Sequence, residues 1–337
     1  MEQLAPGIAE PVGLSRRRSA EVYVRTAANK DLTTVIADLL EHIKWEELIP
    51  SGGFVLLKPN FCEYRSDRIA YANTSYPFLE AVCAVLSGRA GRIAIVESDG
   101  IRYPIEQVYQ QMGLERLAQR YGVRLVNLTQ ERTVKFPEPL LEDFELPAIF
   151  GECDCFISLP KLKTHALTYF TGALKNQWGC IPRPDRILLH KHIHTLIPRL
   201  QQLLNTRLAI MDGLIAMEGR GPTNGMRREL GLCLASTDLV ALDATAMRVV
   251  GLEPRNARHV VEAATLGLGT MRDEEIRVDS DERQRITPFV PPPKEWPIAL
   301  MNYLTRYRPF VYHVLLDASL FACGKRVADS LRKWRLT

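Results

Sequence analysis

The segment Pro160–His165 concentrates side chains that can do chemistry. Lys161, Lys163 and His165 occupy alternate positions in it, so an extended backbone places all three on one side. Lysines hold phosphate or carboxylate groups, and a desolvated lysine also acts as a base or as a Schiff-base nucleophile. The segment therefore predicts an anion-binding centre with acid/base capacity, and the alternative is a solvated basic loop.

Lys175 and Asn176 extend this set within the next predicted helix, which ends near Gly179. Lysines and a histidine so close together in sequence are well suited to hold an anionic small molecule. The expected catalytic residues are Lys161, Lys163, His165, Lys175 and Asp212, and the expected substrate-binding residues are Lys58, Asn60, Asn176, Gly179, Glu218, Gly219, Gly221 and Asp243.

Polar residues also follow five predicted strands, at the point where each strand ends. The carboxyl ends of parallel strands open at one edge of a sheet, and ligands bind there where the strand order reverses. We therefore expect these residues to surround one crevice. Ser, Thr and Asp could instead cap the following helices, but lysine does not cap a helix N-terminus. The five groups are Lys58–Asn60, Ser98–Gly100, Pro160–His165, Asp212–Gly213 and Ser236–Asp238.

Carboxylates are expected to complete the crevice. Asp212, with Glu218 or Asp243, would orient a base or hold a divalent ion. Asp243 falls on an otherwise apolar helix, where a buried carboxylate needs a partner. We expect it to face Lys161, Lys163 or a metal, so a divalent metal is the candidate cofactor.

The segment Glu218–Gly225 is rich in glycine. Gly219 and Gly221 are expected to form a backbone nest for an anion. The spacing of these glycines, with Pro222 among them, does not match a dinucleotide-binding fingerprint. The chain also contains no Walker A sequence and no G-x-S-x-G elbow.

Histidine and cysteine are further candidate metal ligands. His190, His192 and His194 form an H-x-H-x-H run, and in a helix the first and last lie four residues apart, as in zinc sites. A cluster on a helix surface is the favoured alternative. The seven cysteines are odd in number and show no C-x-x-C spacing. They predict reduced thiols, with no intrinsic iron–sulfur cluster and no zinc ribbon.

Short β-rich runs alternate with helical patterns from residue 20 to residue 286. This alternation predicts an α/β fold, in which a layered, mostly parallel sheet carries helices on both faces. The predicted strands are Phe54–Leu57, Arg92–Glu97, Val123–Leu128, Cys153–Leu159, Arg207–Met211 and Gly231–Ala235, and the predicted helices are Ser75–Leu86, Ile105–Tyr121, Leu167–Trp178, Ile187–Leu204, Leu239–Val250 and Ala257–Leu266.

Composition divides the chain into four parts. We expect a flexible N-terminal arm (1–19), an α/β core (20–286), a proline-rich linker (287–297) and a basic, aromatic helical extension (298–337). Pro309 should divide the extension into two helices. These helices could pack back on the core, or serve as an interfacial anchor or partner surface.

Charge and hydropathy limit the kinds of partner that the protein is expected to bind. Seven basic and two acidic residues lie between positions 301 and 337, so the net charge of +4 arises there. The core is therefore not a nucleic-acid-binding surface by bulk charge. No apolar run is long enough to cross a bilayer, and the N-terminus lacks the apolar region of a secretory signal. We expect a cytoplasmic protein, membrane-peripheral if the extension acts as an anchor.

Several of these segments form an ordered set of motifs: Val-Leu-Leu-Lys58-Pro59-Asn60, Ile157–His165, Thr171–Gly179, Met211-Asp212-Gly213, Met217–Pro222 and Ser236–Ala244. From about residue 54 to residue 269, this set resembles the domain-of-unknown-function 362 family. Many members carry a ferredoxin-like iron–sulfur module, which implies redox chemistry. Without a cysteine cluster, this chain resembles a stand-alone member that lacks the module.

Three functions follow from these observations. The first is a biosynthetic enzyme that acts on a carboxylate- or phosphate-bearing molecule by acid/base or metal-assisted chemistry. The second is an oxidoreductase that takes electrons from a separate ferredoxin-like partner, an acidic carrier docked on the basic tail. The third is a non-enzymatic membrane-associated or assembly protein. For the first, Lys161→Ala and Lys163→Ala are expected to abolish turnover and to leave the thermal midpoint nearly unchanged.

Overall fold

The computed structural model describes residues 19–101, 103–138, 141–280, 287–294 and 296–315. In this part of the chain, ten strands form one mixed sheet in the order β12-β1-β11-β10-β7-β2-β3-β4, with β8 paired to β10 and β9 paired to β8. The strands are β1 (Ala20–Thr26), β2 (Phe54–Pro59), β3 (Arg92–Glu97), β4 (Arg124–Asn127), β7 (Cys155–Leu159), β8 (Lys161–His165), β9 (Tyr169–Phe170), β10 (Leu208–Glu218), β11 (Met226–Ser236) and β12 (Ile276–Ser280).

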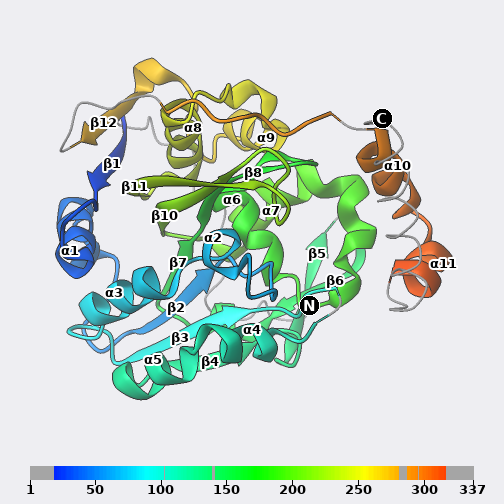
Figure 1. Cartoon of the computed structure of the whole chain (residues 1–337). Helices are drawn as coiled ribbons and strands as arrows, with labels where there is room; N and C mark the ends of the chain where they lie inside the picture. The colour runs from blue at the N-terminus through cyan, green and yellow to red at the C-terminus, as the bar shows by residue number, and fades with distance from the viewer. Residues whose placement is uncertain (1–18, 102, 139–140, 281–286, 295, 316–337) are drawn as a thin grey trace.

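Helices cover both faces of this sheet (Figure 1). Alternate strand residues point to opposite faces, so Leu56 belongs to one core and its neighbours Val55 and Leu57 to the other. The first face carries α6 (Gly172–Asn176), α7 (Ile193–Leu204), α8 (Leu239–Val249) and α9 (Arg258–Thr265), and the second carries α1 (Leu32–Ile43), α3 (Tyr76–Leu86), α4 (Ile105–Met112) and α5 (Leu114–Tyr121).

The α/β class and the largely parallel sheet are confirmed. The five strands β10, β7, β2, β3 and β4 lie parallel and adjacent. Their order reverses beside β2, because the chain moves outward through β3 and β4 and then returns to place β7 on the other flank. The crevice predicted at a reversal of strand order therefore belongs between the carboxyl ends of β2 and β7.

The structure decides one alternative and alters one predicted element. Pro160–His165 is not the solvated loop given as the alternative, because after Pro160 the chain continues as the extended strand β8, and every residue of that strand is buried. The helix predicted over Ile105–Tyr121 is interrupted by Gly113, whose φ of +68° is the left-handed conformation that ends α4 before α5 begins.

The strand direction corrects the predicted crevice. β11 runs antiparallel to both β10 and β1, so Ser236–Asp238 lies at the opposite edge from the other strand ends. Asp238 caps α8 there by accepting a hydrogen bond from the Ala241 amide at 2.9 Å. Asp212 lies within β10, not after it. Asp99 accepts hydrogen bonds from the Ile105 amide and from Asn127, so it is also engaged at the start of a helix.

Several elements were not predicted. β1 and β12 add to one edge of the sheet, and β5 (Thr133–Glu138) pairs with β6 (Leu141–Pro147) in a separate hairpin. The short helix α2 (Ile69–Ala72) lies close to β10. The predicted helix Leu167–Trp178 contains only α6, preceded by β9 and followed by the single 3₁₀ turn η3 (Gln177–Cys180).

The predicted linker lies along the core. Amides of Thr287 and Phe289 donate to carbonyls of Val249 and Val250, and the Phe289 side chain is buried. Beyond it, α10 (Trp296–Leu304) and α11 (Arg308–Phe310) form separate helices, followed by a π-helical turn at Val311–Leu315. Residues 1–18 of the predicted arm, and Lys325, Arg326, Arg332, Lys333 and Arg335 of the basic tail, lie outside the described residues.

Candidate functional site

Two asparagines join the strands at the reversal of strand order. Asn176, at the end of α6, donates from Nδ2 to the Lys58 carbonyl at 2.7 Å and to Ser158 Oγ at 3.1 Å. It thus bridges β2 and β7. Asn60 Nδ2 donates to Asn176 Oδ1 at 3.1 Å, while Asn60 Oδ1 is buried with no hydrogen-bond partner. The structure therefore brings Lys58, Asn60 and Asn176 together, as the sequence predicted.

Lys58 forms a buried ion pair with Glu97, the last residue of β3. Its Nζ lies 2.6 Å from Glu97 Oε2, and both side chains are almost fully buried. Gly179 packs directly on this pair, because a Cβ there would lie 2.1 Å from Glu97 Oε1. Gly179 therefore permits a close approach. Sequence analysis missed Glu97, although an acidic residue that ends an apolar strand is a usable signal.

Lys161 and Asp212 form a second ion pair, with no exposed surface on either side chain. The Nζ–Oδ2 distance is 2.8 Å, and Asp212 also accepts from the amides of Ser75 and Leu214. Burial lowers the pKa of Lys161, and the charge of Asp212 opposes that shift. This geometry corrects the expectation that Lys161→Ala would leave the thermal midpoint unchanged, because the substitution leaves a buried carboxylate without its counter-charge.

Lys163 has an unusual partner. Its Nζ donates to the Ala72 carbonyl at 2.6 Å and lies 2.9 Å from Cys62 Sγ. Lys163 is fully buried, and the structure records no carboxylate among its contacts in the described part of the chain. Cys62 is half-buried. The sequence analysis did not select Cys62, although it lies only two residues beyond Asn60 in the group that follows β2.

Lys175 is half-buried on α6, next to Asn176, and makes no hydrogen bond or ion pair with the residues described here. Burial lowers its pKa from the ordinary 10.5 to about 7, and the nearby charge of Lys163 adds to this effect. Arg186 and Lys58 act in the same direction, whereas Cys62 opposes them. We call Lys58, Lys163 and Lys175 the lysine cluster. Lys175 is the member poised to exchange a proton near neutral pH.

His165 ends β8 with its ring buried. Nδ1 accepts hydrogen bonds from the amides of Leu167 and Thr168, at 3.1 and 3.2 Å. Burial, together with the positive charge of Lys175, holds its pKa well below the usual 6.5. The ring is therefore neutral at pH 7, and because Nδ1 is an acceptor the proton resides on Nε2. His165 can donate a hydrogen bond but does not add a charge.

Asp243 acts on α6, not on the buried lysines. Its carboxylate accepts from the amides of Ala173 and Leu174 at 2.6 and 3.1 Å, and burial raises its pKa to about 7. Gly172, at φ +58°, lets the backbone pass within contact of the carboxylate. The expectation that Asp243 faces Lys161 or Lys163 is wrong. It positions the helix that carries Lys175.

The glycine-rich segment is engaged in backbone contacts. The Gly219 amide donates to the Val290 carbonyl, and the Gly221 amide donates to Gly219 O. Both amides are therefore used within the protein, which corrects the predicted anion nest. Glu218 accepts a hydrogen bond from the Val290 amide at 3.0 Å and so helps to hold the predicted linker against the core. A Cβ on Gly221 would meet the Thr164 carbonyl at 1.9 Å, so this glycine allows the loop to lie against β8.

His190 and His194, the disfavoured metal-binding pair, lie on different elements. His190 lies in the last turn of the 3₁₀ segment η4 (Pro184–His192) near Trp178, with ring centroids 5.7 Å apart. His194 lies on α7 beside His259, at 6.3 Å. Burial lowers the pKa values of His190 and His259 to about 3. Within the described ranges, no group of three or more His, Cys, Asp or Glu side chains is placed to hold a metal ion.

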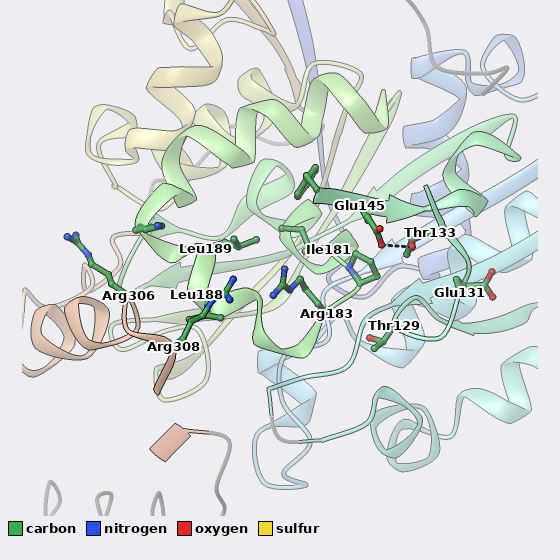
Figure 2. A pocket seen from close by; sticks show the side chains of 13 residues that line it. Thr129, Glu131, Thr133, Glu145, Ile181, Arg183, Leu188, Leu189, Arg306 and Arg308 are labelled. Atoms are coloured by element: carbon green, nitrogen blue, oxygen red, sulfur yellow. Dashed lines mark hydrogen bonds between the residues drawn. The ribbon is translucent and has the colours of Figure 1, made fainter. Parts of the chain in front are cut away.

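A cavity of about 480 Å³ lies apart from the lysine cluster, next to the residues that follow η3 (Figure 2). It is bounded by the β5–β6 hairpin, by the segment that follows η3 and by the C-terminal helices. The lysine cluster does not line it. Arg183 faces it but is neutralised by two hydrogen bonds to Asp185, and Glu145 accepts from Thr133. Its charged lining residues are Glu131, Glu145, Arg183, Lys191, Arg306 and Arg308.

Comparisons with known proteins show similarity to one family, to one curated relative and to solved structures. Residues 55–248 match the family described as domain of unknown function (DUF362). The chain is 27% identical over 264 residues to the thylakoid-associated protein sll1697 of Synechocystis sp., which covers 76% of this chain and 79% of the relative. The lactate racemase apoprotein of Thermoanaerobacterium thermosaccharolyticum aligns with a TM-score of 0.41 and 10% identity, over 72% of this chain and 56% of that one. The family match spans more than half of the chain, and the protein belongs to the DUF362 family.

Proposed function

We propose that the protein is an enzyme that binds a carboxylate- or phosphate-bearing small molecule at the lysine cluster and uses Lys175 as its acid/base group. The observation that carries this proposal is Lys175 itself. It is a half-buried amine that lacks an acidic partner among the described residues, and burial lowers its pKa to about 7. Acid/base catalysis is most effective when the pKa of the group lies near the working pH.

The charge balance around Lys175 favours an anion. Glu97 neutralises Lys58, but among the described residues the recorded polar contacts of Lys163 Nζ are a carbonyl and a sulfur. Arg186 donates to the carbonyls of Asp99 and Arg183 and forms no recorded ion pair within the described ranges. Poorly solvated cations without counter-charge are unfavourable, and a bound carboxylate or phosphate would supply that charge.

Anion binding gives the first test. Inorganic phosphate and oxalate, at constant ionic strength, are expected to raise the thermal midpoint by a few degrees, because a ligand that binds only the folded state stabilises it. Lys175→Met is expected to abolish most of this rise. Lys191→Met removes an exposed lysine and should keep it. Equal rises in the wild type and in Lys175→Met would contradict the proposal.

Peripheral attachment to a membrane is a second candidate function. Four apolar or aromatic side chains on and just after α10 and α11 are about half exposed, whereas Val311 and Leu315 pack against Leu188 on the core. The extension thus has one face bound to the core and one aromatic face open, with Arg306 stacked over Tyr303 at 5.6 Å. A relative named as thylakoid-associated supports the same function. The open side chains are Leu300, Tyr303, Tyr307 and Tyr312.

Vesicle flotation tests the membrane candidate. The full-length protein is expected to float with vesicles that contain anionic lipid, because aromatic rings and arginines suit the interface of such a bilayer. Tyr303→Ser with Tyr307→Ser should reduce the floating fraction several-fold. Leu266→Ser changes an equally exposed apolar residue elsewhere and serves as the control. Flotation unaffected by the double substitution would remove this candidate. No helix among the described residues is long and apolar enough to cross a bilayer.

A further inference from the structure

Cys62 is the only described cysteine that the structure records in contact with a lysine amine. Lys163 Nζ lies 2.9 Å from Sγ, and the second recorded contact of that amine is the Ala72 carbonyl. The carbonyls of Ala72 and Pro222 lie farther from the sulfur, each at 3.7 Å. A neighbouring ammonium group favours the thiolate, which is the nucleophilic form of cysteine.

The other described cysteines lie in different surroundings. Cys83, Cys155, Cys180 and Cys233 are buried, and Cys153 is half-buried like Cys62. Burial raises the pKa of Cys153 to about 12 and that of Cys155 to about 11. Their thiols remain protonated at neutral pH. Cys153, with similar exposure but no lysine contact, is therefore a matched internal reference for Cys62.

Groups suited to bind a substrate lie within electrostatic range of Cys62. Cys62 opposes the lowering of the Lys175 pKa, and Lys175 has no recorded partner in the described part of the chain. Burial, together with Cys62, raises the pKa of Tyr103. Asn60 Oδ1 is buried without a partner two residues earlier. An electrophile with an anionic group would find a nucleophile, uncompensated positive charge and a proton donor in one place.

We propose that Cys62 is the nucleophile of this site and that its substrates carry an electrophilic carbonyl carbon beside a carboxylate. The thiolate sulfur forms a bond to that carbon, the C=O π electrons move to the oxygen, and the Lys175 ammonium gives its proton to that oxygen. The product is a hemithioacetal or hemithioketal, so no oxidant and no leaving group is needed. The anionic part of the substrate class rests on the proposed function, whereas the nucleophilic sulfur does not.

Alkylation of the folded full-length protein tests the inference. Iodoacetamide and iodoacetate both react by attack of sulfur on the CH₂ carbon with loss of iodide, and peptide mass spectrometry locates the product. At pH 7, Cys62 is expected to react at least about tenfold faster than Cys153. Lys163→Met should slow Cys62 by about tenfold, and Lys163→Arg should retain most of the rate. Slow labelling of Cys153 in every variant shows that each remains folded.

Comparison of the two reagents separates the two proposals. If an anion site surrounds Cys62, the ratio of the iodoacetate rate to the iodoacetamide rate at Cys62 should be higher than at Cys153 in the wild type. This preference for iodoacetate should be lost in Lys175→Met. Fast alkylation without any preference for iodoacetate would support Cys62 as the nucleophile and contradict the anion site. If Cys62 is as slow as Cys153 with both reagents, the nucleophile inference fails, and phosphate binding at Lys175 still decides the proposed function.

Discussion

Replacing Lys161 with methionine is expected to lower the free energy of unfolding by about 3–5 kcal/mol, since it leaves one charge of a buried pair uncompensated. Lys161 and Asp212 have no exposed surface, and their Nζ–Oδ2 distance is 2.8 Å. Asp212 cannot turn to solvent, because the amides of Ser75 and Leu214 hold it. Denaturant unfolding followed by circular dichroism measures the loss.

A second substitution distinguishes charge from packing. Lys161→Met with Asp212→Asn removes both charges and keeps an oxygen that accepts from one of the amides, so a large part of the loss should be recovered. Lys191→Met, which alters an exposed lysine, should stay within about 0.5 kcal/mol of the wild type. The buried-pair argument fails if the single Lys161 variant is as stable as the wild type, or if the double variant recovers nothing.

Because substitution of Lys161 is expected to destabilise the fold, a different lysine must be substituted to test catalysis. A loss of turnover in a Lys161 variant would not separate a chemical role from damage to the fold. Lys175 makes no recorded contact of this kind within the described ranges, and its side chain is partly open to solvent. Substitution of Lys175 therefore tests the chemistry of the site with the least disturbance to the core.

The sequence predicts the parallel part of the sheet well, because apolar runs such as Phe54–Leu57 and Arg92–Glu97 are buried on both faces. The antiparallel direction of β11 was not predicted. The predicted strands end at Met211 and restart at Gly231, which leaves about 19 residues, enough for a crossover to a parallel neighbour. In the structure both strands extend towards each other, and only seven residues separate Glu218 at the end of β10 from Met226 at the start of β11. A connection of that length cannot hold a crossover, so the pair is antiparallel.

Partner choice within the site depends on tertiary register, which spacing along the chain does not reveal. Lys161 stands beside Asp212 because β8 and β10 pair with those two residues in register. From the sequence, Asp243 was an equally plausible partner for Lys161. In the structure its carboxylate instead accepts hydrogen bonds from two amides of α6. Asn60 lies at the reversal of strand order because it follows β2, and such a reversal gathers residues at strand ends irrespective of register. Asn176 reaches the same place from the end of α6.

The stability of the protein should depend on pH through Lys175. Its pKa is 10.5 in the unfolded chain and about 7 in the folded protein, chiefly because of burial. The folded protein therefore favours the neutral amine. Between these values the unfolded chain binds the extra proton, and the contribution of Lys175 to stability rises with pH. Below pH 7 the amine is protonated in both states, and this dependence ends. One pKa unit corresponds to about 1.4 kcal/mol, so the total is a few kcal/mol.

Lys175→Met isolates this contribution. The difference in unfolding free energy, variant minus wild type, is expected to grow in favour of the variant as the pH falls from about 10.5 to about 7. Other titrating groups cancel in that difference, and Lys191→Met should give a flat profile. Saturating phosphate should flatten the Lys175 profile too, since an anion stabilises the protonated amine and raises its pKa towards the unfolded value. A flat profile for Lys175→Met without phosphate would mean that the amine is solvated and charged at pH 7, which would remove the acid/base role.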